Sequence, residues 1–163
     1  MVLKQTFKNH FIIFEFSLSI TILFFIGWWY FEFDRDYLLV VGIFHLLFTI
    51  PSLYLHIEYS IRNSGEEIEI NPNEIIVRKN GQEKRYSISD LAKIIVYKSA
   101  SLDKWGMPLT AMEYYRYARL MVKNGEEIII TCLMSRKVDE EVRKLSGVPY
   151  ERKKGFFCTL SWK

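Results

Sequence analysis

Two long apolar runs near the N-terminus constrain the fold of this chain more than any other feature. They occupy residues 11–31 and 37–57, and the second run contains no Asp, Glu, Lys or Arg. At a rise of ~1.5 Å per residue, each run is roughly 31 Å long as a helix, which matches the hydrocarbon core of a bilayer. A short charged link at residues 32–36 separates them. We therefore expect a transmembrane helical hairpin.

The first run differs from a cleaved signal peptide. It is too long, and it ends in Trp28, Trp29 and Tyr30 instead of small residues. Together with Tyr37 on the other side of the link, these aromatic residues are typical of an interfacial belt. The run is therefore interpreted as an uncleaved anchor.

The basic residues near the helix ends predict the orientation of the helical hairpin. Lys4 and Lys8 precede the first run, whereas the link contains only Arg35. Further basic residues follow the second run: Arg62, Arg78 and Lys79. The positive-inside rule then places both termini in the cytoplasm and the link outside.

Glu15 is a charged residue within the first apolar run, where a carboxylate is costly without a partner. Folding the hairpin about residue 34 places Glu15 opposite residue 53, within about one helical turn of His56. Two interpretations remain open. A Glu15–His56 pair could titrate as a proton or ion site, or it could be a structural interhelical hydrogen bond near the cytoplasmic interface.

The chain divides into an N-terminal arm with the helical hairpin, residues 1–62, and a cytoplasmic domain, residues 63–163. The formal net charge of the chain is only +3. This mild charge favours a nearby anionic leaflet, and it does not indicate nucleic acid as a partner.

Alternating apolar residues and turn signals predict a series of antiparallel strands in the second domain. Two Asn-Gly turns, at residues 80–81 and 124–125, are strong signals for tight β-hairpins. The six expected strands are residues 67–70, 74–79, 82–88, 92–98, 115–123 and 126–132.

One soluble helix should follow these strands. Ser135 is its expected N-cap, and Val138, Val142 and Leu145 form a narrow apolar stripe at helical spacing. Gly147 is expected to end it.

Two segments outside the regular elements are candidate contact sites. The irregular stretch 99–113 contains Trp105, which would indicate a binding or membrane-dipping role if exposed and simple packing if buried. The second segment holds three consecutive cations, Arg152, Lys153 and Lys154, followed by Phe156 and Phe157. The cations could contact anionic lipid headgroups, or they could be a solvated run beside aromatic residues packed into the domain.

The paired strand hairpins, and the segment 125–133 leading into a helix, look like a pleckstrin-homology (PH)-type roll. A membrane hairpin followed by such a roll resembles the bacterial PH-like membrane proteins. The resemblance implies a membrane-anchored α+β fold: a two-helix transmembrane hairpin, then a PH-like antiparallel β-roll with one C-terminal amphipathic helix. It also implies a binding or scaffolding role at the inner face of a bacterial membrane. The turn at residues 68–74 is acidic where phosphoinositide-binding relatives are basic, so specific inositide binding is not expected.

The residues that catalysis usually requires are scarce in the second domain. All three histidines, His10, His45 and His56, lie in or beside the apolar runs, and no glycine-rich phosphate loop is present. Cys132 and Cys158 lack metal-ligand spacing and are expected to be reduced, packed thiols. We therefore expect no enzyme activity, no catalytic or metal site and no cofactor.

The sequence favours a non-enzymatic, membrane-tethered PH-like module in the bacterial inner membrane. Its expected partners are the bilayer, a protein partner or a second copy, and possible anionic lipid headgroups. The alternative is a small membrane transport or assembly subunit in which polar residues within the helical hairpin act inside an oligomer.

Overall fold

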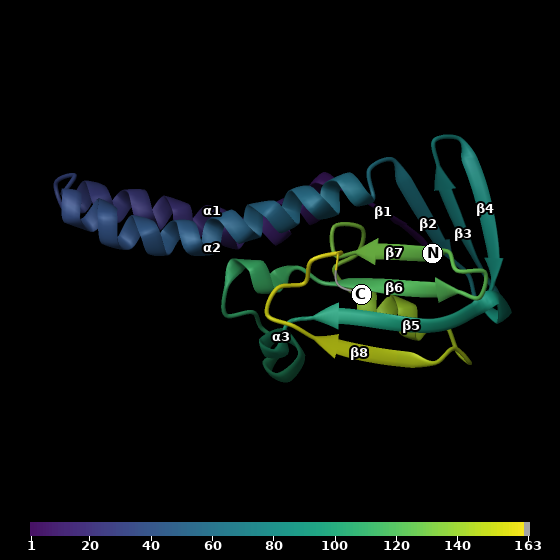
Figure 1. Ribbon diagram of the computed structural model, residues 1–163. Helices are drawn as coiled ribbons and strands as arrows, with labels where there is room; N and C mark the ends of the chain where they lie inside the picture. Colours follow the sequence, from purple (N-terminus) through teal and green to yellow (C-terminus); the bar gives the residue numbers. More distant parts are fainter. Residues whose placement is uncertain (162–163) are drawn as a thin grey trace.

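The computed structural model describes residues 1–161, and two long helices project from one side of its β-structure (Figure 1). They are α1 (Phe7–Tyr30) and α2 (Arg35–Arg62), packed against each other as a helical hairpin. The side chain of Thr6 caps α1 by accepting a hydrogen bond from the backbone N–H of Asn9. Asp34 caps α2 in the same way through the N–H of Tyr37. At the end nearest the strands, both helices extend beyond the apolar runs, because α1 begins at Phe7 and α2 ends at Arg62.

The strands form two four-stranded sheets. The first has the order β1-β2-β3-β4 and is antiparallel throughout. The second has the order β7-β6-β5-β8, with β8 parallel to β5. The bounds of the first sheet are β1 (Val2–Lys4), β2 (Glu66–Ile70), β3 (Glu74–Lys79) and β4 (Gln82–Ser87). Those of the second are β5 (Leu91–Lys98), β6 (Tyr117–Val122), β7 (Glu127–Thr131) and β8 (Tyr150–Lys154).

All six predicted strands are present, and two further strands were not predicted. The first, β1, lies before the helical hairpin and pairs with β2, which lies after it. The second, β8, contains the predicted run of three cations and pairs with β5. Both are short strands whose partners are distant in the sequence, so local patterning gives little signal for them.

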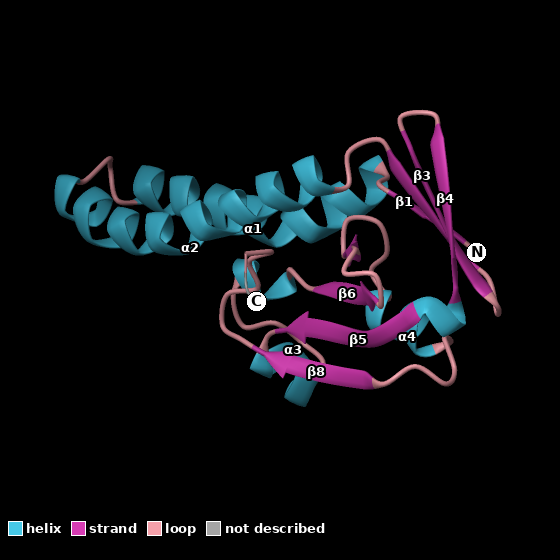
Figure 2. Cartoon of the chain, turned by 45° about the vertical axis from the view of Figure 1, so that its right-hand side comes forward, coloured by secondary structure: helices cyan, strands magenta, loops and turns pink. Residues whose placement is uncertain are grey.

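Short helices lie between the strands of the second sheet and at its start, as Figure 2 shows. They are η1 (Ile88–Asp90), α3 (Ala100–Trp105), η2 (Ala111–Tyr114) and α4 (Val138–Arg143). The predicted C-terminal helix is α4, but it begins at Val138 and is shorter than expected. Ser135 is not its N-cap, because its hydroxyl accepts a hydrogen bond from the N–H of Lys137 in the turn before the helix.

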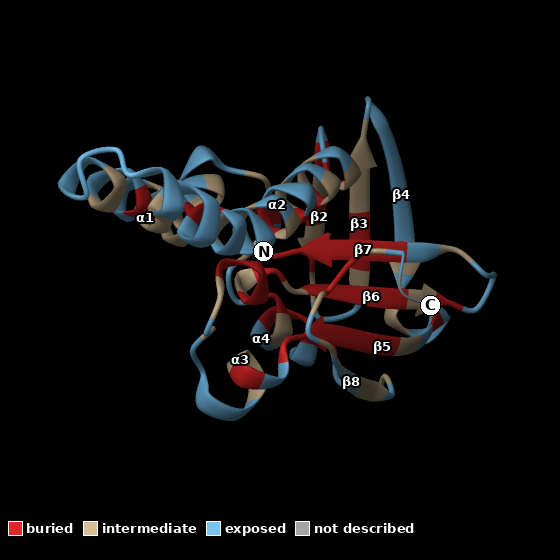
Figure 3. Cartoon of the chain, turned by 60° about the vertical axis from the view of Figure 1, so that its left-hand side comes forward, coloured by how far each residue is buried: buried red, intermediate tan, exposed pale blue. Residues whose placement is uncertain are grey.

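Two apolar clusters hold the fold together. The first fills the space between the two sheets and α4, where Val138, Val142 and Leu145 are buried as the apolar stripe predicts. The second lies between the second sheet and the base of the helical hairpin, and it includes Ile13 and Leu55. Figure 3 shows the result: β5, β6 and β7 are largely buried, while most of the helical hairpin is exposed.

Candidate functional site

The base of the helical hairpin is built into the core of the second sheet. Tyr59 of α2 is fully buried, and its ring meets those of Tyr115 and Tyr117 edge-on. Its hydroxyl donates a hydrogen bond to the carbonyl oxygen of Cys158 at 2.6 Å. The ring of a buried tyrosine adds apolar contact area, and the hydrogen bond of its hydroxyl fixes the orientation of the side chain. The helices and the strands therefore meet through a buried, closely packed junction.

A chain of polar contacts crosses this junction. Nδ1 of His10 lies 3.0 Å from Nε2 of His56, and Nδ1 of His56 lies 3.0 Å from the hydroxyl of Tyr115. These two contacts link His10 of α1 to His56 of α2, and His56 to Tyr115 at the start of the segment before β6. The structure does not bring Glu15 and His56 together, because Glu15 is exposed on α1 while His56 contacts His10 and Tyr115.

The helices themselves are joined by a hydroxyl pair. Ser17 and Ser52 are both buried, with their Oγ atoms 2.7 Å apart. The expected antiparallel register is therefore correct to within one residue. In the folded hairpin, however, Glu15 lies on the exposed face of α1. Small hydroxyl residues that allow close approach and share a hydrogen bond are typical of helix pairs in lipid.

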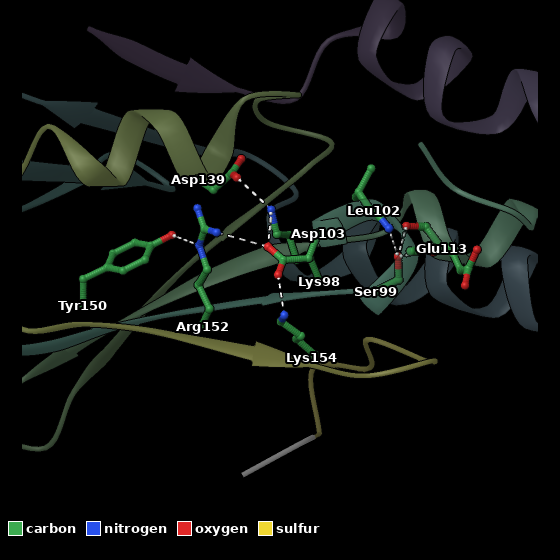
Figure 4. Close-up of polar contacts among 10 residues, drawn as sticks. Lys98, Ser99, Leu102, Asp103, Glu113, Asp139, Tyr150, Arg152 and Lys154 are labelled. Atoms are coloured by element: carbon green, nitrogen blue, oxygen red, sulfur yellow. Dashed lines mark hydrogen bonds and ion pairs between the residues drawn. The ribbon is translucent and has the colours of Figure 1, made fainter. Parts of the chain in front are cut away.

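The three cations of β8 are engaged within the protein, as Figure 4 shows for Arg152 and Lys154. Both contact the carboxylate of Asp103 in α3, at 3.1 and 2.8 Å, and the buried Lys98 contacts it at 2.9 Å. Hydrogen bonds from Lys154 and Lys98 lower the pKa of Asp103 to about 2. The ammonium group of Lys153 lies 5.7 Å from the ring centre of Tyr97. Contact of these cations with lipid or a partner stays a prediction.

Trp105 is exposed at the end of α3. Ser99 caps this helix by accepting a hydrogen bond from the N–H of Leu102, and Gly106 ends it with a φ of +72°, which suits glycine. Phe156 is also exposed, whereas Phe157 is partly buried and stacks on Tyr54 of α2. Trp105 is therefore exposed and not packed into the domain, and its binding or membrane-dipping role stays a prediction.

Sequence reasoning missed His10, Tyr115 and Asp103 as members of these contacts. Their partners are far away in the sequence, so only the folded structure brings them together. A local signal did exist for α3, since Ser99 and Gly106 have the spacing of a helix N-cap and a C-terminal glycine.

The groups that meet at the junction are histidine and tyrosine side chains among apolar residues, whereas Arg152 and Lys154 meet the carboxylate of Asp103 beside β8. Within residues 1–161, no group of three or more His, Cys, Asp or Glu is placed to hold a metal ion. The two cysteines in that range are buried and unpaired.

Two β-sheets closed by a short helix, with a helical hairpin inserted after the first strand, define the class of protein as a PH-like α+β module. A family model described as PH domain matches residues 2–139, and the chain belongs to that family. The predicted PH-like resemblance and α+β fold class are thus confirmed, and the two long apolar helices are candidate membrane spans. No curated protein and no solved structure matches the chain. The matched range includes β1 and the whole helical hairpin but ends within α4, so β8 lies outside it. PH domains in general bind lipids or proteins and are typically non-catalytic.

Proposed function

We propose that this chain is a non-enzymatic, membrane-tethered PH module at the cytoplasmic face of a bacterial inner membrane. It binds a protein partner there or associates with a second copy of itself. The observation that carries the proposal is the position of α1 and α2, which leave the roll after β1 and return to it at β2.

The exposure of the two helices supports insertion in a membrane. Both are long and apolar enough to cross one, yet only 17% and 11% of their most apolar windows are buried within the protein. A core helix of a soluble protein would be mostly buried. A water-exposed apolar surface of this size is unfavourable, and a bilayer removes that cost because it is itself apolar.

The pairing of β1 with β2 supports the proposed topology. These strands flank the helical hairpin in sequence and lie side by side in one sheet, so both ends of the hairpin are on the same side of any membrane it crosses. Removal of the N-terminal segment would also remove β1 from the sheet, which argues against a cleaved leader. The basic residues near these ends support the assignment of that side to the cytoplasm.

We favour an anchor over a transport subunit because the polar side chains at the contact between α1 and α2 have partners within the chain, while Glu15 lies outside that contact. Ser17 contacts Ser52, and His56 contacts His10 and Tyr115. Groups engaged in this way stabilise the helix pair and its junction with the roll.

Cysteine accessibility in intact bacterial spheroplasts tests the topology. Asp36→Cys adds a thiol at the start of α2, and Gln82→Cys adds one on the exposed strand β4. A membrane-impermeant maleimide should label Asp36→Cys from outside and Gln82→Cys only after lysis. The unsubstituted chain gives the background, since both native cysteines are buried. Labelling of both positions from the same side, or release of the protein by alkaline carbonate, would refute the tether.

Crosslinking in native membranes tests the binding function. A photo-crosslinking residue at Gln82 or Arg85, both exposed on β4, should give a defined adduct with a partner or a second copy. β4 is suited to this because it is an exposed edge strand of the first sheet. Purification that yields only the bare monomer, with no adduct from either position, would count against a binding module.

A further inference from the structure

Four large apolar side chains are exposed in the part of the roll that follows the helical hairpin. After Arg62, within the part of the chain that the structure describes, they are Trp105 (57% exposed), Met107 (59%), Leu109 (58%) and Phe156 (63%). They come from only two segments: the end of α3 with the loop 106–110 that follows it, and the loop 155–157 after β8. We call these four side chains the apolar rim. A gathering of exposed apolar side chains on an otherwise polar surface marks a contact site.

Both loops lie on the side of the roll from which the helical hairpin projects (Figure 1). Leu109 shares a groove of about 470 Å³ with Ile20 of α1 and Phe48 of α2. The second loop lies beside α2 as well, because the rings of Phe157 and Tyr54 stack with centres 6.1 Å apart. The two loops that carry the apolar rim therefore lie beside the helices part of the way along their length.

The length of α1 and α2 beyond the apolar rim determines how deep the rim lies in the bilayer. From the level of the groove to the tip of the hairpin, residues 20–30 of α1 measure about 16 Å and residues 35–48 of α2 about 21 Å at the helical rise. The hydrocarbon core of a bilayer is about 30 Å thick. If the rim stayed in water, the helices beyond it would be too short to cross. Any tilt of the helices shortens their reach further.

The backbone of the rim is also prepared for an apolar environment. The buried carboxylate of Glu113 accepts hydrogen bonds from the N–H groups of Leu109 and Thr110, at 2.6 and 3.0 Å. Irregular backbone is tolerated at membrane depth only when its polar groups are satisfied within the protein. Glu113 satisfies two such groups in the loop that contains Leu109.

We propose that the apolar rim is a second membrane contact, inserted into the cytoplasmic leaflet beside the helical hairpin. The inference rests on the proposed membrane tether and adds the lipid-contacting residues of the roll. Trp105 suits the interface between headgroups and chains, and Lys104, whose ammonium lies 5.8 Å from the Trp105 ring centre, can face lipid phosphates there. Contact at both the hairpin and the rim fixes the orientation of the roll, with β3 and β4 directed into the cytoplasm.

Spin-label accessibility in the full chain, reconstituted in phosphatidylethanolamine–phosphatidylglycerol vesicles, tests this proposal. Met107→Cys and Phe156→Cys report on the rim. Leu47→Cys, exposed on α2, is the control for lipid contact, and Gln82→Cys is the control for water. All four positions are exposed, so the variants should fold. At the rim, collisions with a water-soluble nickel chelate should be about fivefold rarer than at Gln82, because lipid excludes charged solutes. Collisions with oxygen should be as frequent as at Leu47.

The controls separate failure of this inference from failure of the tether. If Leu47 is in lipid while Met107 and Phe156 are as accessible to the chelate as Gln82, the rim is in water and the inference is overturned, although the tether stands. If Leu47 itself is in water, the tether fails. If the rim labels are shielded from both the chelate and oxygen, a protein covers the rim and the lipid assignment is wrong.

Discussion

Leu3 of β1 lies directly opposite Ile68 of β2, and both side chains are buried in the cluster between the sheets. The whole helical hairpin lies between these two residues in the sequence. The terminal amine of Met1 adds a hydrogen bond to the carbonyl oxygen of Ile70 at 2.9 Å. The first residues of the chain thus complete the roll, and α1 and α2 are an insertion between two paired strands.

We expect Leu3→Ala to destabilise the roll by about 2–4 kcal/mol, because it removes a buried leucine from a core that cannot fully close around the cavity. Val2→Ala is a matched control on the same strand, since Val2 is exposed. It should change stability by less than about 0.5 kcal/mol. Urea unfolding of both full-length variants in detergent, followed by near-ultraviolet circular dichroism, measures the difference. Equal stability of the two variants would mean that β1 contributes little to the sheet.

The parts of the fold that sequence reasoning predicted are those with local signals. Alternating residues and the two Asn-Gly turns predicted β2 to β7, and the length of the two apolar runs predicted the helical hairpin. The register of α1 against α2 followed from the short link between them. Each of these features depends on residues that are close in the sequence.

The parts that were missed depend on contacts between distant residues. β1 has three residues, too few for a recognisable pattern, and exists because β2 offers an open edge. The cations of β8 were not assigned to a strand, since nothing nearby indicates that Asp103 would pair with Arg152 and Lys154. His56 was paired with Glu15 from register alone, whereas the angular position of each residue around its helix decides which side chains meet.

Asp103 should stabilise the roll in a pH-dependent way. Its pKa is lowered to about 2 by hydrogen bonds from Lys154 and Lys98, below the ordinary value of 3.8. A carboxyl group with a lowered pKa in the folded state contributes stability above its unfolded pKa and loses it as the pH falls toward the folded value. The stability that Asp103 provides should therefore be complete above pH ~5 and decline between pH ~4 and ~2.

Asp103→Asn tests this contribution. Because the substitution leaves the buried ammonium of Lys98 without its nearest carboxylate, we expect a loss of about 3 kcal/mol at pH 7. The loss should shrink as the pH falls below 4. Asp139→Asn is the control, since Asp139 contacts Lys98 at a longer 3.4 Å and is more exposed. Urea unfolding at several pH values measures both variants, and a loss independent of pH would contradict the ion-pair account.

Tyr115→Phe should weaken the junction between the helical hairpin and the roll. The substitution keeps the ring in the core but removes the hydroxyl that lies 3.0 Å from Nδ1 of His56. We expect a loss of about 1–2 kcal/mol, because a nitrogen of the half-buried His56 loses its hydrogen-bond partner. Tyr114→Phe, at the neighbouring and less buried position, should have a smaller effect. Proteolysis rates at the helix bases, compared with global unfolding, would show whether the junction opens first.

Neither native thiol should react with maleimide while the protein is folded. Burial raises the pKa of Cys132 to about 11 and that of Cys158 to about 12. At pH 8 the reactive thiolate of Cys132 is therefore only about one part in a thousand, and the surrounding core blocks access to it. Mass spectrometry after maleimide treatment should find no adduct in the folded chain and two adducts after denaturation. Rapid labelling of Cys158 without denaturant would show that the segment beside Tyr59 opens readily, which would contradict a closely packed junction.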